Sequence, residues 1–324
     1  MHLNSLLLSV KRLLLMVFTG LLIGAAPVTQ PGLFDADTVL DLTLGGDLNT
    51  LFNDRGEVPA LHPVMLSVSG EQPMAIQAKV RGHFRKDKSN CSTPPLLLDF
   101  SGVSFSAGSI FTGQKKLKLV TPCQDDRYVV REYLVYQLYR QFTERSFRAR
   151  LVRVNFRDDR KPDKARTMYC FLIEDEESMA ARNNAALLER DLIRPETTDK
   201  ENFLTMAMFE LMIANTDWSV QYRQNIKLIG GTGQPVYTVP YDFDHSGIVA
   251  APYAKPAEAL QMSSVRERRY RGYCLKDISE FDNAIRLFNA KKDQVMAVYT
   301  GNNLLDEKYA ANTRTYLEEF YTII

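Results

Sequence analysis

Four side chains carry the chemistry that this sequence suggests: Asp217, Asn225, Asp242 and Asp244. Their carboxylate and amide oxygens suit a hard cation such as Mg²⁺, with Mn²⁺ or Ca²⁺ as alternatives. Asp242 and Asp244 flank Phe243, so in a strand they would share one face while Phe243 points into the core. The sequence therefore predicts a small metal-binding cluster. The competing interpretation is that these residues only cap turns and solvate the surface.

A predicted hairpin brings the four residues together. Two apolar runs, Ile226–Ile229 and Val236–Val239, flank the glycine-rich turn at residues 230–233, which is the pattern of two paired strands. The outer ends of an antiparallel hairpin meet. We therefore expect Asn225 to lie within a residue or two of being opposite Asp242.

The upstream half contains the charged residues that phosphoryl transfer also needs. Lys116 and Lys118 lie on a predicted strand at residues 115–120, and Glu132 lies on a helix predicted over Tyr128–Phe142. In kinase chemistry one carboxylate orients the acceptor, an Asn and an Asp hold metal ions, and a Lys paired with a helix Glu fixes the phosphates. The order of these residue types along the chain favours such a site, although lysines on a strand also commonly form a solvated face.

The elements that must position these residues divide into two parts. Residues 27–174 are mostly predicted strands with one internal helix, and residues 175–324 are mostly predicted helices with the hairpin among them. This layout predicts an α+β fold with a β-rich N-lobe (27–174) and a helical C-lobe (175–324). The helices of the C-lobe are expected at residues 176–188, 201–214, 281–299 and 306–321.

Residues 1–26 have the pattern of a secretory signal peptide. Lys11 and Arg12 precede an apolar run from Leu13 to Ile23, and small residues follow it. A retained anchor is the alternative, and no later segment is apolar for long enough to span a membrane. We therefore expect an exported chain that is periplasmic, surface-bound or secreted. Its formal net charge of +1 gives no reason to expect a nucleic acid partner.

Export would permit disulfide bonds between the four cysteines. Cys91 and Cys123 flank two strands predicted at residues 95–100 and 115–121. The end of one strand and the start of its neighbour can be close in space, so we predict a Cys91–Cys123 bridge, with two unpaired thiols as the alternative. Cys170 lies in an apolar strand and is expected to be a core thiol.

The region from Arg81 to about Gly272 resembles the atypical kinases of the spore coat protein CotH type, more distantly HipA-like kinases, and a group of exported bacterial proteins. The segments that carry the resemblance are RGHFR, KKLKLV, REYLVYQLYRQF, FLIEDEE, NTDWSVQYRQN and PYDFDHSG. The resemblance implies a two-lobed protein-kinase-like fold that binds ATP or another nucleotide. Asp217 and Asn225 are eight positions apart, whereas five separate the Asp and Asn of the protein kinase motif HRDxxxxN.

The resemblance also implies roles for individual residues. Asp217 corresponds to the catalytic Asp, and the metal ligands are Asn225 and Asp242, with Asp244 as the alternative or second carboxylate. The remaining roles are phosphate contacts by Lys118 or Lys116 with help from Arg81, ion pairing by Glu132, and a hinge position for Glu174.

The sequence thus predicts an exported kinase that binds a nucleotide and Mg²⁺ between two lobes. Its acceptor would be the hydroxyl of an unidentified protein or small molecule, and the chain is expected to be a monomer. The alternative function is that of a non-catalytic envelope or cell-surface binding protein, which would use the acidic cluster structurally, with Ca²⁺.

Overall fold

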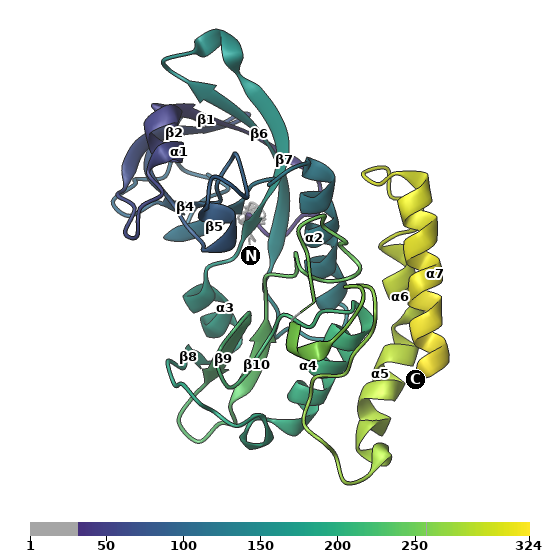
Figure 1. Cartoon of the computed structure of the whole chain (residues 1–324). Coiled ribbons are helices and arrows are strands. Elements are labelled where there is room, and N and C mark those ends of the chain that lie inside the picture. Colours follow the sequence, from purple (N-terminus) through teal and green to yellow (C-terminus); the bar gives the residue numbers. More distant parts are fainter. Residues whose placement is uncertain (1–31, 257) are drawn as a thin grey trace, which may run out of the picture. The chain divides into compact units, whose positions relative to one another are not determined.

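The computed structural model describes residues 32–256 and 258–324, so the predicted signal peptide lies outside the described residues. The N-terminal part of the described chain is a closed barrel of seven strands in the order β1-β2-β3-β4-β5-β7-β6 (Figure 1). The strands are β1 (Leu40–Gly46), β2 (His62–Val68), β3 (Met74–Val80), β4 (Leu96–Asp99), β5 (Lys116–Val120), β6 (Ala149–Asp158) and β7 (Arg166–Ile173).

Alternating side chains fill the barrel. In β3, Met74, Ile76, Ala78 and Val80 are buried in its core, because successive side chains of a strand point to opposite faces. Strand β1 closes the barrel by pairing antiparallel with β2 and parallel with β6.

The barrel and the sheet that follows it show that the expected fold class is wrong. We predicted a two-lobed protein-kinase-like fold with a β-rich N-lobe and a helical C-lobe. The N-terminal strands instead close on themselves, and the C-terminal part contains a three-stranded sheet in the order β10-β9-β8. Closure depends on pairing between distant residues, such as Leu40 with Val152, and the apolar pattern of a single strand does not reveal its partner.

The predicted hairpin is confirmed. Strand β9 (Ile226–Gly230) pairs antiparallel with β10 (Tyr237–Pro240), and the register places Pro240 opposite Ile226. The helix expected over residues 176–188 is shorter than predicted, because Ala186–Leu187 join the sheet as β8. The helix expected over residues 281–299 is divided in two. The observed helices are α1 (Leu48–Asn53), α2 (Asp126–Tyr139), α3 (Glu176–Arg182), α4 (Lys200–Met212), α5 (Asp282–Ala290), α6 (Lys292–Ala297) and α7 (Glu307–Ile323).

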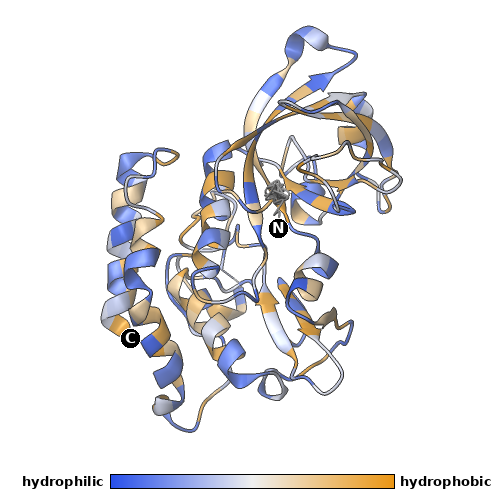
Figure 2. Cartoon of the chain, turned by 180° about the vertical axis from the view of Figure 1, so that it is seen from behind, coloured by the Kyte–Doolittle hydropathy of each residue, from blue (hydrophilic) through white to orange (hydrophobic). Residues whose placement is uncertain are grey.

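Strand β7 has buried residues on both of its faces. Cys170 and Leu172 belong to the barrel core, whereas Phe171 and Ile173 pack in the same core as α2 and α4. Cys170 is therefore the core thiol that was predicted. Helix α7 carries both hydrophobic and hydrophilic residues (Figure 2). Its Leu317 and Phe320 are fully buried. Among the described residues, no helix is both long and apolar enough to cross a bilayer.

Candidate functional site

A cavity of about 380 Å³ is lined by residues from the barrel, from α2 and from the loops around the β9–β10 hairpin. Charged and polar side chains dominate its wall. The residues predicted from sequence that line it are Arg81, Lys118, Glu132, Asp217, Asn225, Asp242 and Asp244. The structure therefore brings together most of a set that is spread over more than half of the chain.

The hairpin delivers Asn225 and Asp242 to the cavity. Tyr241 N donates a 3.0 Å hydrogen bond to Asn225 O, which extends the β9–β10 ladder by one residue. Just beyond it, Asp242 N donates to Tyr136 Oη over 2.9 Å. Asn225 and Asp242 both have left-handed backbones, with φ values of +53° and +62°. Such conformations cost about 1–3 kcal/mol in residues other than glycine and cluster at functional sites.

Asp217 enters the cavity from the loop that follows α4. Asn225 Nδ2 donates to Asp217 Oδ2 over 3.0 Å and also to the Asp217 backbone carbonyl, and the Gln224 amide donates to Asp217 Oδ1. These bonds fix the Asp217 carboxylate, and they use the amide nitrogen of Asn225. The carbonyl oxygen of the Asn225 amide is then the atom that this side chain can offer to a cation.

Arg85 is the site residue that the sequence did not single out. Its guanidinium is buried and lies 2.7 Å from Glu132 Oε2, 2.9 Å from Asp244 Oδ2 and 3.5 Å from Asp242 Oδ1. Tyr253 Oη donates to Asp244 Oδ2 over 3.0 Å. One arginine thus faces three carboxyl groups, which compete for its positive charge.

The three carboxylates differ in their environments. Burial raises the pKa of Glu132 to about 8, and Arg85 offsets part of this effect. Burial opposes ionisation of Asp244 as well, but Arg85 and His245 hold its pKa below the usual range. Loss of hydration and the charge of the neighbouring Asp244 raise the pKa of Asp242. Its side chain nevertheless remains 44% exposed, compared with 8% for Asp244. Asp242 is therefore the carboxylate of this group most open to a ligand.

Lys118, which lines the cavity, shares the Glu176 carboxylate with Lys227. Lys118 Nζ and Lys227 Nζ lie 3.2 Å and 2.8 Å from the same Glu176 oxygen. Burial, followed by the charge of Arg81, lowers the pKa of Lys118. Two lysines thus share one carboxylate and Arg81 lies close enough to act on Lys118, which leaves a positive excess that suits an anionic ligand.

The ion-pair partners of Glu132 and Lys118 differ from the predicted ones. Glu132 pairs with Arg85 and Lys118 with Glu176, so the expected Lys–Glu132 pair does not form. Arg85 and Glu176 lie in RGHFR and FLIEDEE, two of the segments that carry the family resemblance. Their place in these segments was the sequence signal that could have identified both residues.

Lys116 and Glu174 do not line the cavity. Lys116 is exposed at the start of β5, where it pairs in register with Asp99. The carboxylate of Glu174 binds the Arg182 side chain and the Arg148 backbone. The structure gives Glu174 a role in joining α3 to β6, and neither residue is placed to contact a ligand in this cavity.

The arginine-rich segment RERRYRG, residues 266–272, forms no ion pair with Asp242 or Asp244 among the described contacts. Arg268 donates to the carbonyls of Met212 and Tyr316, and Arg271 donates to the carbonyl of Trp218. These bonds attach the segment to α4, α7 and the loop that carries Asp217.

The donor set fits a metal ion that is bound together with a phosphate ligand. Within residues 32–256 and 258–324, no group of three or more His, Cys, Asp or Glu residues is arranged to hold a metal by itself. Mg²⁺ commonly binds through one or two carboxylates, with water and substrate phosphates as its other ligands. Asp242 and Asn225 supply oxygen donors of this kind beside the basic side of the cavity.

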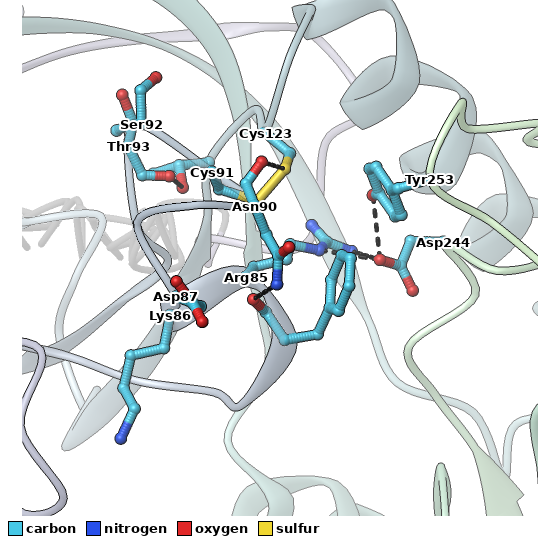
Figure 3. Close-up of a disulfide and its surroundings, with 12 residues drawn as sticks. Arg85, Lys86, Asp87, Asn90, Cys91, Ser92, Thr93, Cys123, Asp244 and Tyr253 are labelled. Carbon is cyan, nitrogen blue, oxygen red and sulfur yellow. Dashed lines mark hydrogen bonds and ion pairs between the residues drawn. A yellow bond between two sulfur atoms is a disulfide. The ribbon is translucent and has the colours of Figure 1, made fainter.

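The predicted disulfide is confirmed, and it fixes the loop that carries Arg85. Cys91 and Cys123 are bonded, with their Cα atoms 4.5 Å apart. The loop on either side of Arg85 is further held by a 2.9 Å hydrogen bond from Asn90 Nδ2 to Phe84 O (Figure 3). Arg55 donates to the carbonyls of several loop residues, including Cys91. The bridge therefore anchors the chain six residues after Arg85.

Replacing both cysteines of this bridge by serine is expected to lower the free energy of unfolding by about 2–4 kcal/mol, because the unfolded chain is no longer cross-linked. Chemical denaturation of the oxidised proteins measures this difference. The control is a reductant, which should destabilise the wild-type protein but leave the double variant unchanged. Equal stability of the two oxidised proteins would contradict the expected contribution.

The sequence matches no protein-family model and no curated protein. Among solved structures, the chain is similar to the proinflammatory kinase CtkA of Helicobacter pylori, with 10% sequence identity and a TM-score of 0.42 over 71% of this chain and 88% of that chain. The relationship to CotH-type kinases is not confirmed by these comparisons.

Proposed function

We propose that the cavity binds a nucleotide together with Mg²⁺, and that the protein transfers a phosphoryl group to the hydroxyl of a protein or small molecule. One observation carries this proposal. The wall of a single cavity has a basic side, formed by Arg81 and Lys118, and an acidic side that includes Asp217 and Asp242. Phosphoryl transfer needs this combination, because the ligand is anionic and its charge is shared with a divalent cation.

The residues have distinct roles in this proposal. Lys118 and Arg81 would hold phosphate oxygens, and Asp242 and Asn225 would hold the metal. Mg²⁺, or Mn²⁺ in its place, neutralises charge on the phosphates when bound. Arg85 keeps Asp244 ionised and in place. Asp244 would therefore support the position of Asp242, which is the carboxylate that would bind the metal.

Asp217 is placed to orient the acceptor. Its carboxylate lies at the cavity wall and is fixed by Asn225 and Gln224. As the acceptor oxygen bonds to phosphorus, the bond to the leaving phosphate breaks and the hydroxyl proton passes to Asp217. Gln224 and Asn225 hold the carboxylate in one orientation before the acceptor arrives.

Replacing Asp242 by alanine tests the proposal. The purified wild-type chain should bind ATP or another nucleotide in the presence of Mg²⁺, and Asp242→Ala should weaken that binding by at least about tenfold, because one metal ligand is lost. Calorimetric titration with each nucleotide measures both values. Asp41→Ala is the matched control, since Asp41 forms an exposed ion pair with Arg153 on the barrel surface. A wild-type chain that binds no nucleotide would refute the proposal.

We also propose that the protein works outside the cytoplasm. The Cys91–Cys123 disulfide supports this location, because such bonds persist mainly in oxidising compartments.

A further inference from the structure

A second cavity, of about 380 Å³, lies on the barrel and is lined by α1, the loop that follows Arg85 and the hairpin of β6 and β7. We call it the barrel cavity. It shares no lining residue with the cavity of the candidate site. Its charged lining residues are one acidic and five basic: Asp158, Arg55, Lys88, Lys161, Lys164 and Arg166. Because the formal net charge of the chain is only +1, this positive excess is a local feature.

Two of the five cations are used by the protein itself. Arg55 donates to the backbone carbonyl of Cys91, and Lys88 Nζ donates to Asn53 Oδ1 over 3.1 Å. The other three are exposed and form no ion pair or side-chain hydrogen bond with a described residue: Lys161, Lys164 and Arg166. The wall thus sets one carboxylate, that of Asp158, against three unpaired cations, which favours an anionic ligand.

The barrel cavity also has an apolar part. The rings of Phe52 and Phe156 meet edge to face with their centroids 5.7 Å apart, and Met168 lines the same cavity. Phe156 is buried, whereas Phe52 and Met168 are only half-buried. The open parts of these two side chains give an apolar or aromatic group of a ligand a surface to pack against.

Neutral polar side chains indicate what kind of anionic ligand fits. The barrel cavity is also lined by Asn49, Asn53, Ser92 and Thr93. Amides and hydroxyls both donate and accept hydrogen bonds, which the backbone of a peptide requires. Binding to a bilayer needs an apolar face that can enter the headgroup region, whereas the apolar side chains here line a cavity. An acidic peptide with one apolar side chain matches these features better than a membrane surface does.

We propose that the barrel cavity docks an acidic peptide segment of the protein acceptor. Lys161, Lys164 and Arg166 bind the carboxylates of the segment. Phe52 and Met168 pack against its apolar side chain. The assignment of this segment to the acceptor rests on the proposed function, but the binding of an acidic peptide does not.

One loop borders both cavities and brings them close together. Arg85 lines the cavity of the candidate site, and Ser92 lines the barrel cavity. Figure 3 shows Arg85 directed toward Asp244, with Ser92 on the other side of the disulfide. Arg85 and Ser92 are seven positions apart, a length of chain that spans at most about 25 Å. A protein held at the barrel cavity is therefore near the proposed site of transfer.

Reversing two of the unpaired charges tests the binding step. The probe is a short fluorescent peptide with glutamates on both sides of a single phenylalanine, and fluorescence anisotropy measures its affinity. Lys164→Glu combined with Arg166→Glu should weaken binding at least about tenfold, because two attractive charges become repulsive. The wild-type affinity should also fall as salt is added. Lys308→Glu combined with Arg314→Glu, at exposed positions of α7, is the matched control and should bind as the wild type does.

Transfer assays test the docking role. A serine peptide joined to the acidic segment should have a KM at least about tenfold lower than the same peptide without the segment, because docking raises its effective concentration at the site. In the Lys164→Glu, Arg166→Glu variant this difference should disappear, while the KM for nucleotide stays unchanged. Neither residue lines the cavity of the candidate site.

Three results would overturn the inference. One is equal affinity of the wild type and the Lys164→Glu, Arg166→Glu variant for the probe peptide. Another is equal binding of a peptide with serine in place of phenylalanine, which would contradict packing on Phe52 and Met168. The third is a wild-type chain that binds vesicles of anionic lipid but not the peptide, which would make this surface a membrane contact. If the wild-type chain binds no nucleotide, the proposed function fails, but the peptide measurements still decide whether the barrel cavity binds acidic segments.

Discussion

Replacing Asp217 by asparagine is expected to slow phosphoryl transfer by about 10²–10⁴-fold, the contribution typical of a positioned general base. Asparagine preserves the size of the side chain and can still accept a hydrogen bond from Asn225, so the fold should be retained. It cannot take the proton of the acceptor hydroxyl. Binding of nucleotide with Mg²⁺ should stay near the wild-type value, because Asp217 is not assigned to the metal or the phosphates.

Steady-state transfer to a hydroxyl acceptor and calorimetric nucleotide binding, measured on the same preparations, separate these two effects. Asp163→Asn, at an exposed position between β6 and β7, is the control for a neutralised aspartate. Unchanged transfer in Asp217→Asn would remove Asp217 from the catalytic step. A parallel loss of nucleotide binding would assign it to the metal site instead.

The second large effect is expected at Arg85. Arg85→Ala should lower the free energy of unfolding at neutral pH by about 3–5 kcal/mol, because it leaves buried carboxylates without a counter-charge. Glu132 and Asp244 both lose a bond shorter than 3 Å to the guanidinium. Chemical denaturation measures the loss. Arg153→Ala is the matched control, since its pair with Asp41 is exposed to solvent and should contribute little to stability.

The effect of Arg85→Ala should also depend on pH. Arg85 holds the pKa of Asp244 below its ordinary value of 3.8, so in the wild-type protein this pair stabilises the fold above that value. The contribution disappears as the pH falls through the lower, folded-state pKa. The difference in stability between wild type and Arg85→Ala should therefore shrink toward acidic pH. A difference that is constant with pH would mean that Arg85 acts through packing alone.

The local parts of the site could be predicted from sequence because they depend on short-range patterns. The hairpin follows from two apolar runs around a glycine-rich turn. Its ladder continues by one bond from Tyr241 N to Asn225 O, so Asn225 lies one residue from being opposite Asp242, within the expected range. Phe243 was expected to point into the core, and it is fully buried. The strand on which that expectation depended is not formed, because β10 ends at Pro240 and Asp242 has a left-handed backbone. The Cys91–Cys123 bridge followed from the positions of two predicted strands.

The arrangement of these parts could not be predicted in the same way. The closed barrel depends on β1 pairing with β6, and nothing in either strand identifies its partner. Arg85 was missed because a single arginine in a polar loop resembles a solvated residue until the fold buries it. The pairing of Glu132 with Arg85 and of Lys118 with Glu176 depends on long-range geometry, which the order of residues along the chain does not determine.

The position of a bound metal tests the central claim most directly. Crystals of the protein grown with Mn²⁺ and a non-hydrolysable nucleotide would show the metal by its anomalous scattering. We expect one strong peak in contact with Asp242 and Asn225, and the nucleotide phosphates between that peak and Lys118. A peak elsewhere in the molecule, or phosphates that leave Lys118 and Arg81 uncontacted, would contradict the assignment of this cavity to phosphoryl transfer.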